Sequence, residues 1–222
     1  MTDSQKKVLY IGGHGKVGLL AAPMLSEAGH EVHSLIRKQE QVKDIEKLGA
    51  QAELYDVTQL SVEDWAELLT AYDVVVWGAG NGGRAGAEVT TAVDRDAALA
   101  SIEALEKLKA EGKNVPGYVM ISYMGATKNT TDPSDESWYA YVEAKKDVDN
   151  KLNSTDLNYL ILGPAALTEE PAQGIEVIDK PSREATTSRE LVAQVVTEVV
   201  GRDTFPATPL EFIDGDGKVA DI

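Results

Sequence analysis

The 222-residue sequence contains no cysteine and only three histidines, which are His14, His30 and His33. The absence of cysteine excludes disulfide bonds, thiolate metal ligands and a thiol nucleophile. The three histidines do not show the His-x-x-x-His spacing of a zinc site. We therefore expect no bound metal ion.

Basic residues are scarce as well. The chain has 21 Lys and Arg against 37 Asp and Glu, which gives a formal net charge of −16 at pH 7. A surface this acidic repels phosphate backbones and anionic lipid. We expect a small-molecule substrate as the partner, with no nucleic acid and no membrane, and the sequence leaves both a monomer and a homodimer open.

Long apolar runs are absent too. The first run, Val8–Ile11, is too short for a signal peptide or a membrane span, so we expect a cytoplasmic protein. Apolar residues nevertheless make up 43% of the chain, which is typical of a globular protein. The length suits one large α/β domain spanning residues 1–222.

Strand and helix patterns alternate along the whole chain. The expected strands are 6–13, 32–36, 52–55, 73–77, 117–123, 157–162 and 210–213, and the expected helices are 15–28, 40–48, 62–71, 88–111, 138–152 and 188–200. Strict alternation predicts a Rossmann-type, doubly wound parallel sheet of about seven strands with helices on both faces. Long irregular stretches are expected at 80–87, 127–137 and 165–187, at the sheet edge that binds ligands, and the last is expected to form small substrate-side loops.

A glycine-rich turn joins the first expected strand to the first expected helix. Gly12, Gly15 and Gly18 form a Gly-x-x-Gly-x-x-Gly pattern. Such glycines allow a tight turn, close approach to a pyrophosphate and close helix packing, while the helix N-terminus attracts the phosphates. The pattern predicts NAD(P) binding by residues Gly12, Gly13, His14, Gly15, Lys16, Val17 and Gly18.

The end of the second expected strand bears on the choice of cofactor. An enzyme that selects NAD places an acid there for the ribose 2′-OH, but this sequence has Ile36, followed by Arg37 and Lys38. Two adjacent cations suit the 2′-phosphate of NADP. We expect NADP(H) to be preferred, with NAD(H) still open, and Asp56 and Val57 to reach the adenine.

The chain resembles the atypical short-chain dehydrogenase/reductases, in the branch of NAD(P)H-binding, NmrA-like and sugar epimerase/dehydratase proteins. The resemblance covers nearly the whole chain. It is carried by the Gly12–Gly18 turn, Gly29-His-Glu-Val, Arg37, Asp56-Val57, Val75-Val-Trp-Gly-Ala-Gly, Ile121-Ser-Tyr-Met-Gly, Tyr141-Val-Glu-Ala-Lys and Tyr159-Leu-Ile-Leu-Gly-Pro.

The resemblance implies a Tyr-x-x-x-Lys dyad at Tyr141 and Lys145. In such enzymes the tyrosine is the acid or base during hydride transfer, and the lysine tunes it and holds the nicotinamide ribose. A nearby ammonium favours the phenolate, which lowers the pKa of a tyrosine. Further cofactor contacts are implied at Gly78, Ala79, Gly80, Lys145 and Pro164.

Two positions depart from the pattern of these enzymes. The Ser or Thr that polarises the substrate oxygen aligns with Tyr123, so either Ser122 or the Tyr123 hydroxyl takes this role, or the role is lost. The Arg-Pro pair after the sixth strand is replaced by Gly163-Pro164, and Arg84 is one candidate to compensate. Three functions follow: an NADP-dependent oxidoreductase acting on a small carbonyl or sugar-like substrate, an epimerase or dehydratase with a bound cofactor, or a non-catalytic NmrA-like dinucleotide sensor.

Overall fold

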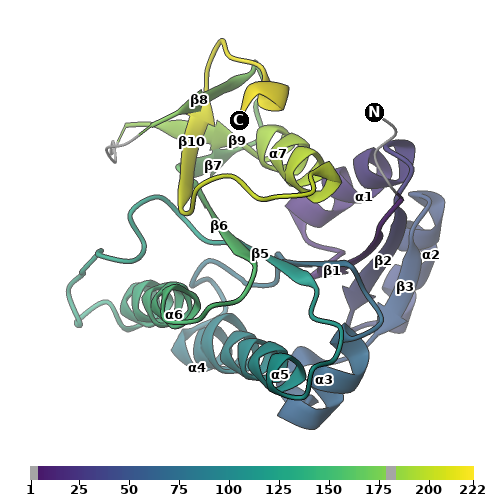
Figure 1. Ribbon diagram of the computed structural model, residues 1–222. Coiled ribbons are helices and arrows are strands. Elements are labelled where there is room, and N and C mark those ends of the chain that lie inside the picture. Colours follow the sequence, from purple (N-terminus) through teal and green to yellow (C-terminus); the bar gives the residue numbers. More distant parts are fainter. Residues whose placement is uncertain (1–4, 179–183) are drawn as a thin grey trace.

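The computed structural model describes residues 5–178 and 184–222 and contains a central eight-stranded sheet (Figure 1). The strand order is β3-β2-β1-β4-β5-β6-β10-β8, in which the first seven strands run parallel and β8 runs antiparallel to β10. The bounds are β1 Lys7–Ile11, β2 Glu31–Ile36, β3 Gln51–Leu54, β4 Val74–Trp77, β5 Gly117–Ile121, β6 Tyr159–Pro164, β8 Ile175–Val177 and β10 Leu210–Asp214. The predicted Rossmann-type parallel sheet is confirmed.

Helices cover both faces of the sheet, as Figure 1 shows. One face carries α1 (Lys16–Glu27), α2 (Val42–Lys47) and α7 (Arg189–Gly201). The other face carries α3 (Val62–Leu69), α5 (Ala98–Ala110) and α6 (Glu136–Asn153). Short 3₁₀ turns lie at Gln39–Gln41, Val57–Gln59 and Val219–Asp221. Within the described residues, no helix combines the length and the apolar character needed to cross a membrane.

Two hydrophobic cores form because successive side chains of a strand point to opposite faces. In β1, Val8 and Tyr10 pack towards α1 and α7, whereas Leu9 and Ile11 pack towards α3 and α5. All four side chains are buried. This double burial explains why the strands read as continuous apolar runs in the sequence.

The stretch 165–187, expected to be irregular, is more ordered than predicted. It contains β7 (Ala166–Thr168), β8 and β9 (Thr186–Ser188), and β7 pairs with β9 in a separate two-stranded sheet. The prediction of loops alone was therefore wrong for these residues, because three-residue strands are too short to show a period in the sequence. Residues 179–183 lie outside the described part of the chain.

The long helix expected at 88–111 has three parts. It begins as α4 (Ala87–Thr90), widens into the π-helical segment η3 (Thr91–Ala97) and continues as α5. A π-helical turn changes the direction of the side chains it carries and is frequent at functional sites. Here the wide turn contains Asp94, which is buried where η3 packs against α6.

Candidate functional site

The glycine turn is fixed to the strands on either side of it. The amides of Gly12 and Gly13 both donate to the carbonyl of Leu35, at 3.1 and 3.0 Å. Gly12 has φ +86°, and a Cβ placed there would lie 2.7 Å from the backbone of Ala79. The turn therefore packs directly on the segment after β4, and its backbone is exposed at the N-terminus of α1, where no side chain caps the helix at Gly15.

A cavity of about 310 Å³ opens beside this turn, at the carboxyl ends of β1, β2 and β4. Its lining comes from the glycine turn, the ends of β2 and β3, the loop after β4 and the first turns of the following helix. The lining residues are Gly12, His14, Gly15, Leu35, Ile36, Arg37, Gln41, Tyr55, Asp56, Val57, Gly78, Ala79, Gly80, Asn81, Ala85, Val89 and Val93. The backbone and apolar surfaces of this lining, together with the N-terminus of α1, are of the kind that binds a dinucleotide.

Many of the expected cofactor residues line this cavity. These are Gly12, His14, Gly15, Arg37, Asp56, Val57, Gly78, Ala79 and Gly80. The residues that sequence reasoning missed include Gln41, Tyr55, Asn81 and Val93. The expected strand 52–55 already placed Tyr55 at a strand end, without assigning it to the site, whereas the others depend on how distant loops pack.

The remaining expected cofactor residues do not line the cavity; they are Gly13, Lys16, Val17, Gly18, Lys38, Lys145 and Pro164. Gly18 packs the helix onto the turn, since a Cβ there would lie 2.7 Å from the Gly13 carbonyl oxygen. Lys16 pairs with Glu169 at 2.6 Å, and the Lys38 ammonium lies 3.8 Å from Glu40. The Pro164 carbonyl accepts the Met124 amide.

Arg37 lines the cavity at the end of β2 and is exposed. Asp56 accepts hydrogen bonds from the amide and the hydroxyl of Thr58, at 3.0 and 2.7 Å. These bonds lower the pKa of Asp56, and the charge of Arg37 lowers it further. The carboxylate is therefore ionised and fixed near neutral pH, and Arg37 is the cation that faces the cavity.

Tyr141 lies in α6 within a stack of aromatic rings. Its ring centroid is 5.6 Å from that of Tyr123 and 5.3 Å from that of Trp138, and both ring pairs are stacked. The loop after β4 covers this region, since a Cβ at Gly83 would lie 3.5 Å from the Cβ of Tyr141. Neither Tyr141 nor Lys145 lines the 310 Å³ cavity.

Burial raises the pKa of Tyr141, and the negative charges of Asp94 and Asp149 raise it further. Arg84, in the loop after β4, acts in the opposite direction. The raised pKa of Tyr141 is opposite to the lowering expected from a neighbouring lysine. The Lys145 ammonium is engaged elsewhere: it donates to the carbonyl of Ile121 at 3.1 Å and lies 3.9 Å from Asp94 Oδ1.

The two candidates for the oxygen-polarising role differ in their surroundings. Ser122 is buried, and its hydroxyl donates to Asp149 Oδ2 at 2.7 Å. The Tyr123 hydroxyl accepts a hydrogen bond from Asn129 at 3.0 Å, and its ring stacks on Tyr141. Sequence reasoning missed Asp94 and Asp149, because a carboxylate in a helix is usually exposed to solvent.

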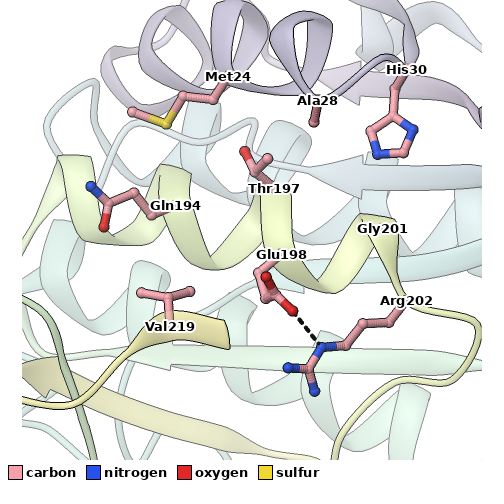
Figure 2. Close-up of a pocket in the computed structure, with 9 residues that line it drawn as sticks. All are labelled: Met24, Ala28, His30, Gln194, Thr197, Glu198, Gly201, Arg202 and Val219. Atoms are coloured by element: carbon pink, nitrogen blue, oxygen red, sulfur yellow. Dashed lines mark hydrogen bonds and ion pairs between the residues drawn. The ribbon is translucent and has the colours of Figure 1, made fainter. Parts of the chain in front are cut away.

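A larger cavity, of about 580 Å³, lies between α1 and α7, as Figure 2 shows. Its lining includes Met24 from α1, Ala28 directly after that helix, and Gln194, Thr197 and Glu198 from α7. The Glu198 carboxylate pairs with Arg202 at 2.9 Å. None of the glycine-turn residues contributes to it, so its size does not make it the dinucleotide site.

Comparison with known proteins agrees with this geometry. The family profile described as NAD(P)H-binding matches residues 12–203, which begin at the first glycine of the turn. The chain belongs to the NAD(P)H-binding family. The matched range includes the glycine turn, all residues that line the 310 Å³ cavity, and α6. The family assignment therefore covers the parts of the fold that form the candidate site.

Proteins similar to this chain come from fungi and bacteria. UPF0659 protein C216.03 of Schizosaccharomyces pombe is 32% identical over 83% of this chain and 80% of its own length. The protein named uncharacterized sugar epimerase YhfK, of Bacillus subtilis, is 28% identical over 97% of each chain. A solved structure from Bacillus halodurans, provisionally described as an NAD-dependent epimerase/dehydratase, superposes with a TM-score of 0.82 at 25% identity, covering 97% of each chain.

Proposed function

We propose that the protein is an NADP(H)-dependent oxidoreductase that acts on a small carbonyl or sugar-like substrate. The observation that carries the proposal is the cavity beside the glycine turn, whose lining brings together the turn before α1, Arg37, and Gly80 and Asn81. The Bacillus relatives, named as epimerase or epimerase/dehydratase, support nicotinamide-dependent chemistry.

The preference for NADP(H) rests on the adenosine end. Arg37 lines the cavity, and Ile36 stands where an NAD-selective acid would be expected. The Arg37 guanidinium can bond a 2′-phosphate with two N–H groups, and Asp56 is already engaged by Thr58. His14 also lines the cavity, but its imidazole pairs with Asp44 at 3.2 Å.

When it is bound, the nicotinamide supplies or takes up a hydride. Tyr141 holds the proton that a reduced substrate oxygen needs, and the rings of Tyr123 and Trp138 both stack with its ring. Lys145 follows Tyr141 by one helical turn, so its ammonium lies on the same face of α6.

Calorimetry with NADPH and NADH tests the cofactor assignment. The parent protein should bind NADPH more tightly, and Arg37→Ala should weaken NADPH about ten- to a hundredfold while NADH changes little. Lys38→Ala is the matched control, because the Lys38 ammonium lies near Glu40 and does not line the cavity. Equal affinity of the parent protein for both cofactors would refute the preference.

A non-catalytic dinucleotide sensor is the second candidate. It is favoured by Ser122, whose hydroxyl is committed to Asp149, and by the burial that raises the pKa of Tyr141. Oxidation of NADPH in the presence of quinones, aldehydes or sugar-like carbonyl compounds distinguishes the two functions. Turnover supports the enzyme, and tight NADPH binding without turnover supports the sensor.

A further inference from the structure

Three charged side chains are enclosed together beside Tyr141. Asp94 is 1% exposed, Lys145 4% and Asp149 1%. Tyr141, Lys145 and Asp149 follow one another at intervals of four residues, so they share one face of α6. Asp94 reaches this face from the π-helical segment η3. The cluster therefore contains two carboxyl groups and one ammonium.

Few hydrogen bonds support these carboxyl groups. Asp149 Oδ2 accepts the Ser122 hydroxyl at 2.7 Å, and the Lys145 ammonium lies 3.9 Å from Asp94 Oδ1. Asp149 Oδ1 and both side-chain oxygens of Asp94 are buried and accept no hydrogen bond from the described residues. The backbone amide of Asn81 is close enough to lower the pKa of Asp94, but it does not form a hydrogen bond of normal geometry with either carboxyl oxygen.

An ionised carboxylate that is buried with so few donors is unfavourable, and protonation relieves the cost. Burial raises the pKa of Asp94, although Lys145 opposes the shift. Burial also raises the pKa of Asp149, to about 6, and Glu211 on β10 adds to this shift while Ser122 and Lys145 oppose it. One ammonium does not balance two buried carboxylates, so the cluster favours the uptake of a proton.

The cluster also acts on the phenol beside it. Asp94 and Asp149 both raise the pKa of Tyr141, and Arg84 is the cation that lowers it. A proton on either carboxyl group removes one of the negative charges that disfavour the phenolate. The protonation state of the cluster and the acidity of Tyr141 are therefore linked.

We propose that Asp94, Lys145 and Asp149 form a buried acid–base unit that binds one proton reversibly and thereby sets the acidity of Tyr141. Asp149 carries the exchangeable proton, the Lys145 ammonium offsets part of the negative charge of the two carboxyl groups, and Ser122 orients Asp149. These are positioning residues, since they act through Tyr141. The consequence for catalysis rests on the function proposed above, whereas proton uptake by the unit does not.

The first test follows the carboxyl groups directly, by NMR of the full chain labelled with carbon-13 at the aspartate carboxyl carbons. One resonance should titrate near pH 6 and should be missing in Asp149→Asn. Lys145→Met and Ser122→Ala should each move its midpoint upwards by about one pH unit, because each removes a group that favours the ionised form. Asp147→Asn, on the exposed face of α6, is the control and should leave the midpoint unchanged.

An Asp149 resonance that titrates in the ordinary range of aspartate, near pH 4, would overturn the proposal. Melting curves followed by circular dichroism establish that each variant is folded. If Asp149→Asn does not fold, the resonance is identified by its response to Ser122→Ala, which removes a single hydroxyl. An unmoved midpoint in both Ser122→Ala and Lys145→Met counts equally against the unit.

The second test follows Tyr141, with carbon-13 at the tyrosine Cζ and Tyr141→Phe to identify its resonance. Asp94→Asn and Asp149→Asn should each lower the titration midpoint of Tyr141 by about one to two pH units, since each removes a nearby charge. An unchanged midpoint refutes the link between the unit and the phenol. Both tests are made without cofactor. A failure to bind NADPH would therefore refute the proposed function without changing the expected titrations of Asp149 and Tyr141.

Discussion

Gly12 and Ala79 are in contact through their backbones, because a Cβ on Gly12 would lie 2.7 Å from both the amide nitrogen and the Cα of Ala79. This contact joins the turn after β1 to the turn after β4, and both turns line the 310 Å³ cavity. The width of the cavity is therefore set by two glycine-containing turns that pack on each other, and not by side chains alone.

The first prediction concerns stability. Gly12→Ala should lower the free energy of unfolding by about 1–3 kcal/mol, because its φ of +86° is strained for alanine and its Cβ would overlap Ala79. Urea denaturation measures the loss. Gly29→Ala is the matched control: its φ is +92°, but a Cβ there meets nothing within 4 Å. Equal losses for the two variants would show that the contact with Ala79 carries no energy.

The second prediction separates binding from folding. Gly15 has φ −73°, and an added Cβ would meet only the Gly12 carbonyl oxygen, at 3.0 Å. Gly15→Ala should therefore fold and cost less stability than Gly12→Ala, whose φ is positive and whose Cβ would meet backbone atoms at 2.7 Å. Its NADPH affinity should fall at least about tenfold, because the methyl group occupies the exposed N-terminus of α1, where the phosphates bind. Calorimetry that shows undiminished affinity would remove the phosphates from this position.

The sheet and the glycine turn could be predicted from the sequence because both rest on local patterns. Val8–Ile11 and Val74–Trp77 are apolar throughout, as doubly buried parallel strands require, and each precedes a glycine. The three-residue strand β8 gave no such signal, since its antiparallel pairing with β10 depends on a distant partner. Local patterns carry no information about such partners.

The chemistry beside Tyr141 was only partly accessible to sequence reasoning. The four-residue spacing predicted that Tyr141 and Lys145 share a helix face, and in the structure both residues lie on one face of α6. The same spacing extends to Asp149, but its burial depends on the packing of β5 and β10. Asp94 reaches Lys145 from the π-helical segment η3, and no residue pattern in that segment predicts a π-helix.

The third prediction concerns catalysis. Once a substrate is found, Tyr141→Phe should lower kcat about 10²- to 10⁴-fold with little change in NADPH affinity, since it removes the proton and keeps the stacked ring. Lys145→Met should reduce kcat as well, because it removes the buried ammonium on the same helix face. Tyr139→Phe is the control, as its ring is exposed two residues earlier on α6. Full activity of Tyr141→Phe would show that the proton comes from another group.

The last prediction links Asp149 to the pH dependence of stability. Its pKa is raised from 3.8 to about 6 by burial, so the folded protein holds this proton more tightly than the unfolded chain does. The resulting stability is fully present below pH 4 and is lost as the pH rises through 6, and it amounts to about 3 kcal/mol. Asp149→Asn stays uncharged and can still accept the Ser122 hydroxyl. The variant should therefore gain stability relative to the parent protein between pH 4 and 7.

Urea denaturation at intervals across that range measures the difference between the two proteins. Carboxyl groups outside the Asp94–Lys145–Asp149 unit titrate in both proteins alike, so their contributions cancel in the comparison. Asp147→Asn, which removes a carboxylate from the exposed side of the same helix, should show no such trend. If the stability curves of Asp149→Asn and the parent protein stay parallel from pH 4 to 7, Asp149 is ionised in the fold without penalty. In that case the buried ammonium of Lys145 is enough to balance it.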